Sequence, residues 1–109
     1  MSVYSATKGA IISFTKALAK EVSDKNVLVN CISPGSVSNN YDEKEPSELS
    51  FIGRTGTHSE NAKLICFLVG DDASYISGQN IRIEGNNIYS SNWYEEQEKL
   101  KQNTEAAEL

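Results

Sequence analysis

The sequence is poor in the residues that build metal sites and disulfides. It contains two cysteines, Cys31 and Cys66, and one histidine, His58, in 109 residues. The cysteines are far apart and lack the close spacing with histidine that a zinc site needs. We therefore expect two free, buried thiols and no metal.

Long apolar runs and basic clusters are absent as well. No window approaches the ~20 apolar residues of a membrane-spanning helix, and no basic start precedes an apolar segment. The formal net charge is -5. An acidic chain without a basic patch is not expected to bind nucleic acid or an anionic membrane. We expect a cytoplasmic protein that acts on small molecules.

The remaining composition is that of an ordinary folded protein. Hydrophobic residues make up 39% of the chain and charged residues 23%. This balance favours a soluble globular fold over a disordered segment, and the length suffices for one small domain.

The pair Tyr4 and Lys8 carries the most informative chemistry. If this segment is helical, the two side chains lie four residues apart on one face. A phenol has an ordinary pKa of about 10, and a neighbouring ammonium favours its ionised form, which brings proton exchange into the neutral range. A carbonyl reductase needs this chemistry, although the same spacing also arises by chance on surface helices.

The first half of the chain predicts a helix, a strand and a loop. Small and apolar residues recur every three or four positions over residues 3–22, which indicates one long packing helix. The apolar run at 27–33 predicts a strand ended by Pro34 and Gly35, and its near-continuous apolarity favours a parallel strand covered on both faces. Residues 36–52 are expected to be a loop, with one short helical turn at 47–51, that serves either as a solvated connection or as a lid.

The second half predicts a capped helix and another strand. Thr57 and Glu60 have the spacing of a capping box, so a helix should begin there and continue to Gly70. Arg54 is expected to form a structural ion pair. Residues 80–84 read as a strand parallel to the first. The predicted fold class is α/β. Two strands are too few for a buried parallel sheet, so the apolar strand and part of the long helix should stay exposed.

Taken in order, these motifs resemble the C-terminal half of a short-chain dehydrogenase/reductase, most like the 3-oxoacyl-carrier-protein reductase type. The similarity covers residues 2–86. It rests on Tyr4-Ser5-Ala6-Thr7-Lys8, Val29-Asn30-Cys31-Ile32-Ser33-Pro34-Gly35-Ser36-Val37, Gly53-Arg54-Thr55-Gly56 and Ser74-Tyr75-Ile76-Ser77-Gly78. The resemblance implies the C-terminal part of a Rossmann-like, doubly wound parallel sheet.

The resemblance also implies roles for individual residues. Tyr4 would exchange the proton with a carbonyl or alcohol substrate, and Lys8 would assist it and hold the ribose of NAD or NADP. Pro34 and Gly35 would line the nicotinamide pocket, and the backbone near Val37 would bond the carboxamide. Asn39 stands where the family often has a cofactor-contacting threonine.

The family's glycine-rich phosphate turn, catalytic serine and catalytic asparagine precede the tyrosine, and only three residues precede Tyr4 here. We therefore expect a truncated domain over residues 1–89, inactive alone, with an acidic tail over 90–109 that is a frayed helix or disordered. It would need a complementing N-terminal half or assemble as a homo-oligomer. The alternative is a non-catalytic interaction module derived from this fold.

Overall fold

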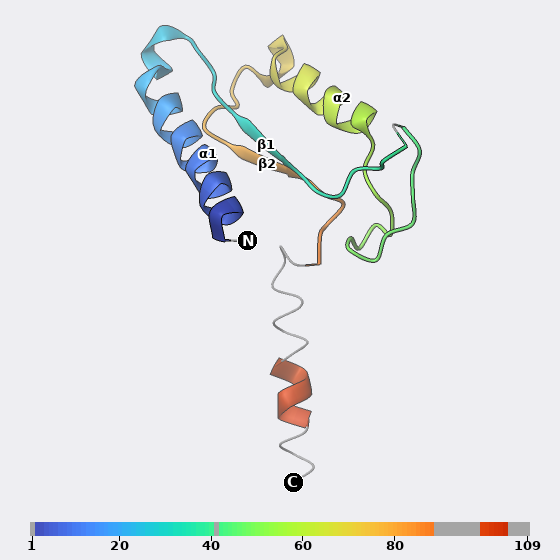
Figure 1. Cartoon of the computed structure of the whole chain (residues 1–109). Helices are drawn as coiled ribbons and strands as arrows, with labels where there is room; N and C mark the ends of the chain where they lie inside the picture. Colours follow the sequence, from blue (N-terminus) through green and yellow to red (C-terminus); the bar gives the residue numbers. More distant parts are fainter. Residues whose placement is uncertain (1, 41, 89–98, 105–109) are drawn as a thin grey trace.

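The computed structural model describes residues 2–40, 42–88 and 99–104 (Figure 1). The main elements are α1 (Ser2–Glu21), β1 (Cys31–Pro34), α2 (His58–Leu68) and β2 (Asn80–Ile83), with short 3-10 turns η1 (Ser23–Lys25) and η2 (Asp71–Ala73). The predicted order of helix, strand, helix, strand is confirmed. None of the described helices is long and apolar enough to cross a membrane.

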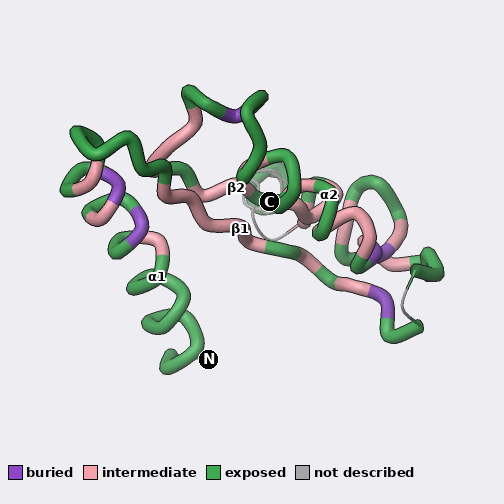
Figure 2. The backbone as a smooth tube through the Cα atoms, turned by 90° about the horizontal axis from the view of Figure 1, so that it is seen from above, coloured by how far each residue is buried: buried purple, intermediate pink, exposed green. Residues whose placement is uncertain are grey.

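The two strands form a parallel pair with a helix on either side. Cys31 lies opposite Asn80, and the register continues to Pro34 opposite Ile83. Figures 1 and 2 show α1 and α2 on opposite sides of this pair. The parallel α/β architecture expected from the sequence is therefore confirmed.

The two faces of the strand pair differ in polarity. Ile32, Ile81 and Ile83 alternate with the polar positions. Ile32 lines a cavity with Ile65 and Leu68 of α2, and Ile83 lines a depression with Glu60 and Asn61 of the same helix. On the α1 side, Asn80 accepts hydrogen bonds from the Ser33 hydroxyl at 2.6 Å and the Cys31 thiol at 3.6 Å. The sheet is thus apolar toward α2 and polar toward α1. The sequence had predicted a first strand that is apolar on both faces.

The first strand is shorter than predicted. It begins at Cys31 rather than residue 27, because its partner begins only at Asn80. The two residues before the strand form hydrogen bonds with the turn at residues 76–78 instead. The Asn30 amide donates to the carbonyl of Ile76 at 2.9 Å, and Gly78 donates its N–H to the carbonyl of Val29 at 2.7 Å.

The start of α2 is fixed by a capping box that also binds an arginine. The Thr57 hydroxyl accepts from the Glu60 N–H at 3.1 Å, and the Glu60 carboxylate accepts from the Thr57 N–H at 3.0 Å. The same carboxylate accepts two hydrogen bonds from the Arg54 guanidinium, each 2.9 Å long. Both the predicted cap and the predicted structural ion pair of Arg54 are confirmed.

The connection between β1 and α2 is a loop, as expected, but the helical turn predicted at 47–51 is wrong. That stretch forms bends and a bridge between Ser50 and Asn87 instead. The Ser38 hydroxyl, only 2% exposed, donates to the Glu45 carboxylate at 3.0 Å. The Thr55 N–H in turn bonds the Glu45 carbonyl at 2.8 Å. Polar contacts, rather than a helix, therefore order the loop.

Little of the described chain is buried. The buried residues are Thr15, Ala19, Ser38, Thr55, Thr57 and Ala73, and no large side chain among the described residues is fully buried. Figure 2 shows them in separate places rather than in one core. The expectation of buried thiols is wrong, because Cys66 is exposed and Cys31 half-buried, although both are free. The predicted exposure of the long helix is confirmed.

Of the expected tail, only residues 99–104 are described. They form a short helix whose residues are all exposed. The rest of the segment 90–109 lies outside the described residues.

Two glycine-to-alanine substitutions should show which glycine the backbone conformation requires. Gly85 has φ +60, and an added Cβ would lie 2.7 Å from the Ile52 side chain, whereas nothing lies within 4 Å of a Cβ at Gly9. Gly85→Ala should lower the free energy of unfolding by about 1–2 kcal/mol or more. Gly9→Ala, inside α1, should raise it by about 0.5–1 kcal/mol. Urea unfolding followed by circular dichroism measures both, and equal effects would contradict this assignment.

The Arg54–Glu60 pair predicts a specific acid dependence. Hydrogen bonding to the Arg54 guanidinium lowers the pKa of the Glu60 carboxyl to about 2 from its usual value near 4.5. A folded pKa below the unfolded one stabilises the protein above pH 4.5, and this contribution is lost as the pH falls toward 2. The difference between the urea midpoints of the parent and Glu60→Gln should therefore be full at pH 7 and shrink as the pH falls from 4.5 toward 2. A gap independent of pH would contradict the ion pair's role.

Candidate active site

An open depression of about 500 Å³ lies between the N-terminal half of α1 and the carboxyl ends of the two strands. It brings together residues from both halves of the fold. Its lining residues are Tyr4, Ser5, Lys8, Ile12, Ser33, Pro34, Asn80, Arg82, Glu84 and Asn87. Three of the residues predicted from the sequence, Tyr4, Lys8 and Pro34, therefore share one site.

Tyr4 and Lys8 stand one turn apart on α1, as their spacing predicts. The Lys8 ammonium lies 5.6 Å from the centroid of the Tyr4 ring. This distance falls within the range of a cation–π contact. The Tyr4 side chain is 61% exposed, so its hydroxyl is accessible to a small molecule. The Tyr4 hydroxyl can exchange a proton with a ligand in the depression, and the Lys8 ammonium provides a positive charge beside that ligand.

Pro34 and Gly35 follow each other at the end of β1 but have different surroundings. Pro34 is exposed and lines the depression. Gly35 is not among the lining residues: its N–H bonds the carbonyl of Ile83 at 3.0 Å, and a Cβ there would lie 2.9 Å from the Cβ of Glu84. The glycine is therefore needed for close packing against the chain that leaves β2.

Val37 and Asn39 lie farther along the loop, outside the lining of the depression. Val37 forms a parallel bridge to Gly56, in which its neighbours Ser36 and Ser38 make the hydrogen bonds. Backbone groups alternate in direction along an extended chain, so the N–H and C=O of Val37 itself point away from Gly56. Asn39 is exposed.

The sequence analysis missed the floor of the depression. Asn80, Arg82 and Glu84 alternate along β2 and its exit, and all three line the site. Polar residues at every second position of a predicted strand were the available signal. That pattern places them on one face, but it does not say which helix the face meets.

The site does not have the composition of a metal centre. Within residues 2–40, 42–88 and 99–104, no three histidine, cysteine, aspartate or glutamate side chains are grouped as they would be around a metal ion.

The strand pair and its depression define a fold class. A parallel strand–helix–strand unit with a ligand-sized depression at the carboxyl ends of its strands is the arrangement of a Rossmann-like fold. Comparison with known proteins agrees. A profile of the family described as enoyl-(acyl carrier protein) reductase matches residues 1–85.

Individual proteins are similar to the chain in sequence or in structure. The chain is 40% identical over 89 residues to the 3-oxoacyl-(acyl-carrier-protein) reductase FabG of Chlamydia trachomatis. Its structure is similar to that of the acetoin dehydrogenase YohF of Salmonella typhimurium, with 33% identity, a TM-score of 0.71 and 78% of this chain covered. A blue fluorescent protein from a metagenomic library, solved in complex with NADPH, shares the fold at 23% identity and a TM-score of 0.69.

The chain therefore belongs to the short-chain dehydrogenase/reductase family of oxidoreductases. The match covers 75% of this chain but 36% of the Chlamydia reductase, and 35% of the Salmonella enzyme. The chain thus spans about a third of the length of the relatives it matches.

Proposed function

We propose that this chain supplies the proton-transfer and substrate part of an NAD(P)-dependent oxidoreductase that interconverts a carbonyl group and an alcohol on a small molecule. The observation that carries the proposal is the shared depression of Tyr4, Lys8 and Pro34 at the carboxyl ends of parallel strands. Ligands of open α/β sheets bind at this end of the strands.

Tyr4 would act as the general acid in reduction. Its hydroxyl donates the proton to the substrate oxygen, and in oxidation the same oxygen accepts the proton from the alcohol. The Lys8 ammonium, 5.6 Å from the ring, offsets the negative charge that the Tyr4 oxygen carries after the transfer. Both groups are accessible from the same depression.

The residues present fit the nicotinamide end of the cofactor. A primary carboxamide has one acceptor oxygen and an NH₂ donor, and the N–H and C=O of Val37, turned away from Gly56, offer the complementary pair. The Lys8 ammonium offers donors for the ribose hydroxyls, and Pro34 offers a surface for the nicotinamide ring. Gly35 and Asn39 lie on the same segment of chain as Pro34 and Val37 and complete the proposed cofactor-binding residues. When bound, the cofactor would exchange a hydride with the substrate carbon. NAD and NADP fit these residues equally.

A complementing N-terminal half is the partner we propose for catalysis. The relatives are about three times as long as the matched segment. The chain also presents a cavity of about 300 Å³ between the region of β1 and α2, whose lining includes the apolar side chains of Leu28, Ile32, Ile65 and Leu68. Leu28 and Ile65 are exposed. An added strand and helix would remove this surface from water.

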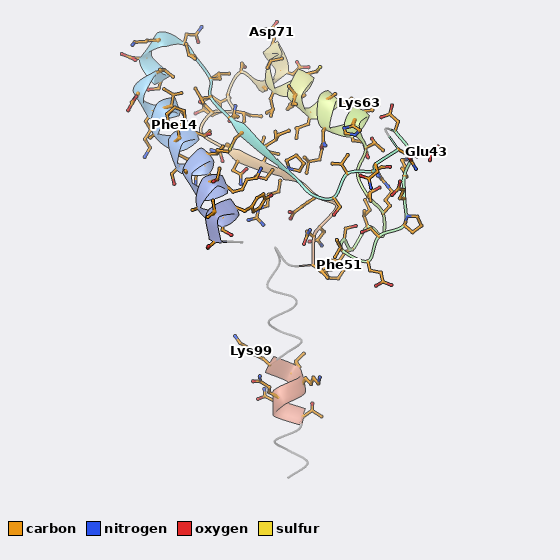
Figure 3. All side chains as sticks on the ribbon, in the orientation of Figure 1. Phe14, Glu43, Phe51, Lys63, Asp71 and Lys99 are labelled. Carbon is orange, nitrogen blue, oxygen red and sulfur yellow. The ribbon has the colours of Figure 1, made fainter. Side chains whose placement is uncertain are left out.

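Self-association through α1 is the second arrangement we propose, compatible with catalysis or with a non-catalytic interaction module. Val3, Ile11 and Phe14 are 79%, 47% and 66% exposed. Figure 3 shows Phe14 on α1. Together with small residues such as Ala6 and Ala10, they form a surface that a second helix can approach closely.

Replacing Tyr4 tests the catalytic proposal. We expect the full chain, co-expressed with the N-terminal half of a related reductase, to oxidise NADPH or NADH in the presence of a small ketone. Tyr4→Phe in that complex should lower kcat by about 10²–10⁴-fold, since it removes a general acid. Tyr75→Phe is the matched control, because Tyr75 is fully exposed outside the depression. Full activity of the Tyr4→Phe complex would contradict the proposal.

Charging the outer surface of α1 tests the assembly. Light scattering should give a mass above that of one chain for the parent protein and a lower mass for Phe14→Glu, because a buried unpaired charge weakens a contact. Ser74→Glu adds the same charge at an exposed position after η2 and should leave the mass unchanged. A parent protein that is monomeric at all concentrations would rule out this arrangement.

A further inference from the structure

The depression is richer in cations and donors than the chain around it. The chain as a whole carries a formal charge of -5, whereas the depression is lined by Lys8 and Arg82 against one carboxylate, Glu84. The Tyr4 hydroxyl adds a further donor. A ligand held here therefore meets a locally positive surface on an acidic protein.

Arg82 has the geometry of a ligand-binding residue. It lies on β2 opposite Ser33, two residues after Asn80, and it lines the depression together with Tyr4 and Lys8. It also borders a second depression near Glu60 and Asn61. Its ion pair with Glu84 spans 3.9 Å, and its side chain is 52% exposed. That separation is too long for a hydrogen bond, so the guanidinium retains donors that can form a fork on a carboxylate.

Asn80 supplies a second donor beside it. Its amide oxygen accepts from the Ser33 hydroxyl at 2.6 Å and from the Cys31 thiol at 3.6 Å, both on β1. Because the oxygen is directed toward β1, the NH₂ group of the same amide is turned to another side. The strand pairing thus fixes the orientation of the Asn80 amide next to Arg82.

We propose that Arg82 is a specificity-determining residue that binds an anionic group of the substrate, with the Asn80 amide as a second donor. The preferred substrates would then be oxo acids and the corresponding hydroxy acids rather than neutral ketones and alcohols. The inference rests on the proposed function, since it assumes that the substrate carbonyl lies against Tyr4. It adds a second point of attachment, which would orient the carbonyl in the depression.

The experiment compares two ligands that differ only in charge. Acetoacetate and its neutral methyl ester are titrated into the full ¹⁵N-labelled chain, and affinities are taken from amide shifts at Tyr4, Lys8 and Arg82. We expect acetoacetate to bind about five-fold more tightly, the scale of a partly exposed ion pair. Inorganic phosphate, titrated alone, separates a site for any anion from a site for an oxo acid, and should bind more weakly than acetoacetate.

Two variants assign the preference to Arg82. Arg82→Gln should reduce the affinity ratio to about one without changing the affinity for the ester, and Arg82→Lys should retain part of the ratio. Lys63→Gln removes the same charge from an exposed position on α2, where Figure 3 labels it, and should leave the ratio unchanged.

The outcomes distinguish this inference from the proposed function. Equal affinity of the parent chain for the two ligands, a ratio that survives in Arg82→Gln, or phosphate binding as tightly as acetoacetate would overturn the role of Arg82. In those cases shifts at Tyr4 caused by the methyl ester would still support the carbonyl site. If neither carbonyl compound shifts Tyr4 or Lys8, both the substrate site and the role of Arg82 are wrong.

Discussion

The parallel pairing of β1 with β2 is the constraint on which the site depends. It places the segment that follows α1 beside the segment that follows α2, with Pro34 opposite Ile83 and Ser33 opposite Arg82. Because of this register, Tyr4 and Lys8 share one open depression with Pro34, Asn80 and Arg82, which come from distant parts of the chain.

Specific polar contacts, more than a hydrophobic core, define the described structure. Buried threonines and serines outnumber buried alanines, and many apolar side chains remain exposed. The capping box, the Arg54 fork and the bond from Ser33 to Asn80 hold the elements in place. Small domains gain most of their stability from apolar burial. A chain with so little burial is structurally consistent with a family whose members are about three times as long.

Local patterns in the sequence were enough to predict the local elements. Spacing alone placed Tyr4 and Lys8 on one helix face and Thr57 with Glu60 in a cap, because these interactions span one helical turn. The start of β1 could not be predicted in this way, since it depends on where the other strand begins. The position of Arg82 in the depression was missed for the same reason, since only the folded arrangement of α1 beside the strands brings Arg82 and Lys8 into one site.

The Glu60 carboxylate joins two parts of the structure, the end of the loop and the start of α2. It closes the cap of α2 through Thr57 and holds Arg54, whose guanidinium also bonds the carbonyl of Thr55 in the preceding loop. Thr55 in turn bonds the backbone of Glu45. Local opening of a protein occurs in contiguous cooperative units. The end of the loop and the first turn of α2 therefore form one such unit, and hydrogen exchange in the two segments should be coupled through Glu60, with a second link from the Ser59 N–H to the Asp42 carboxylate at 3.1 Å.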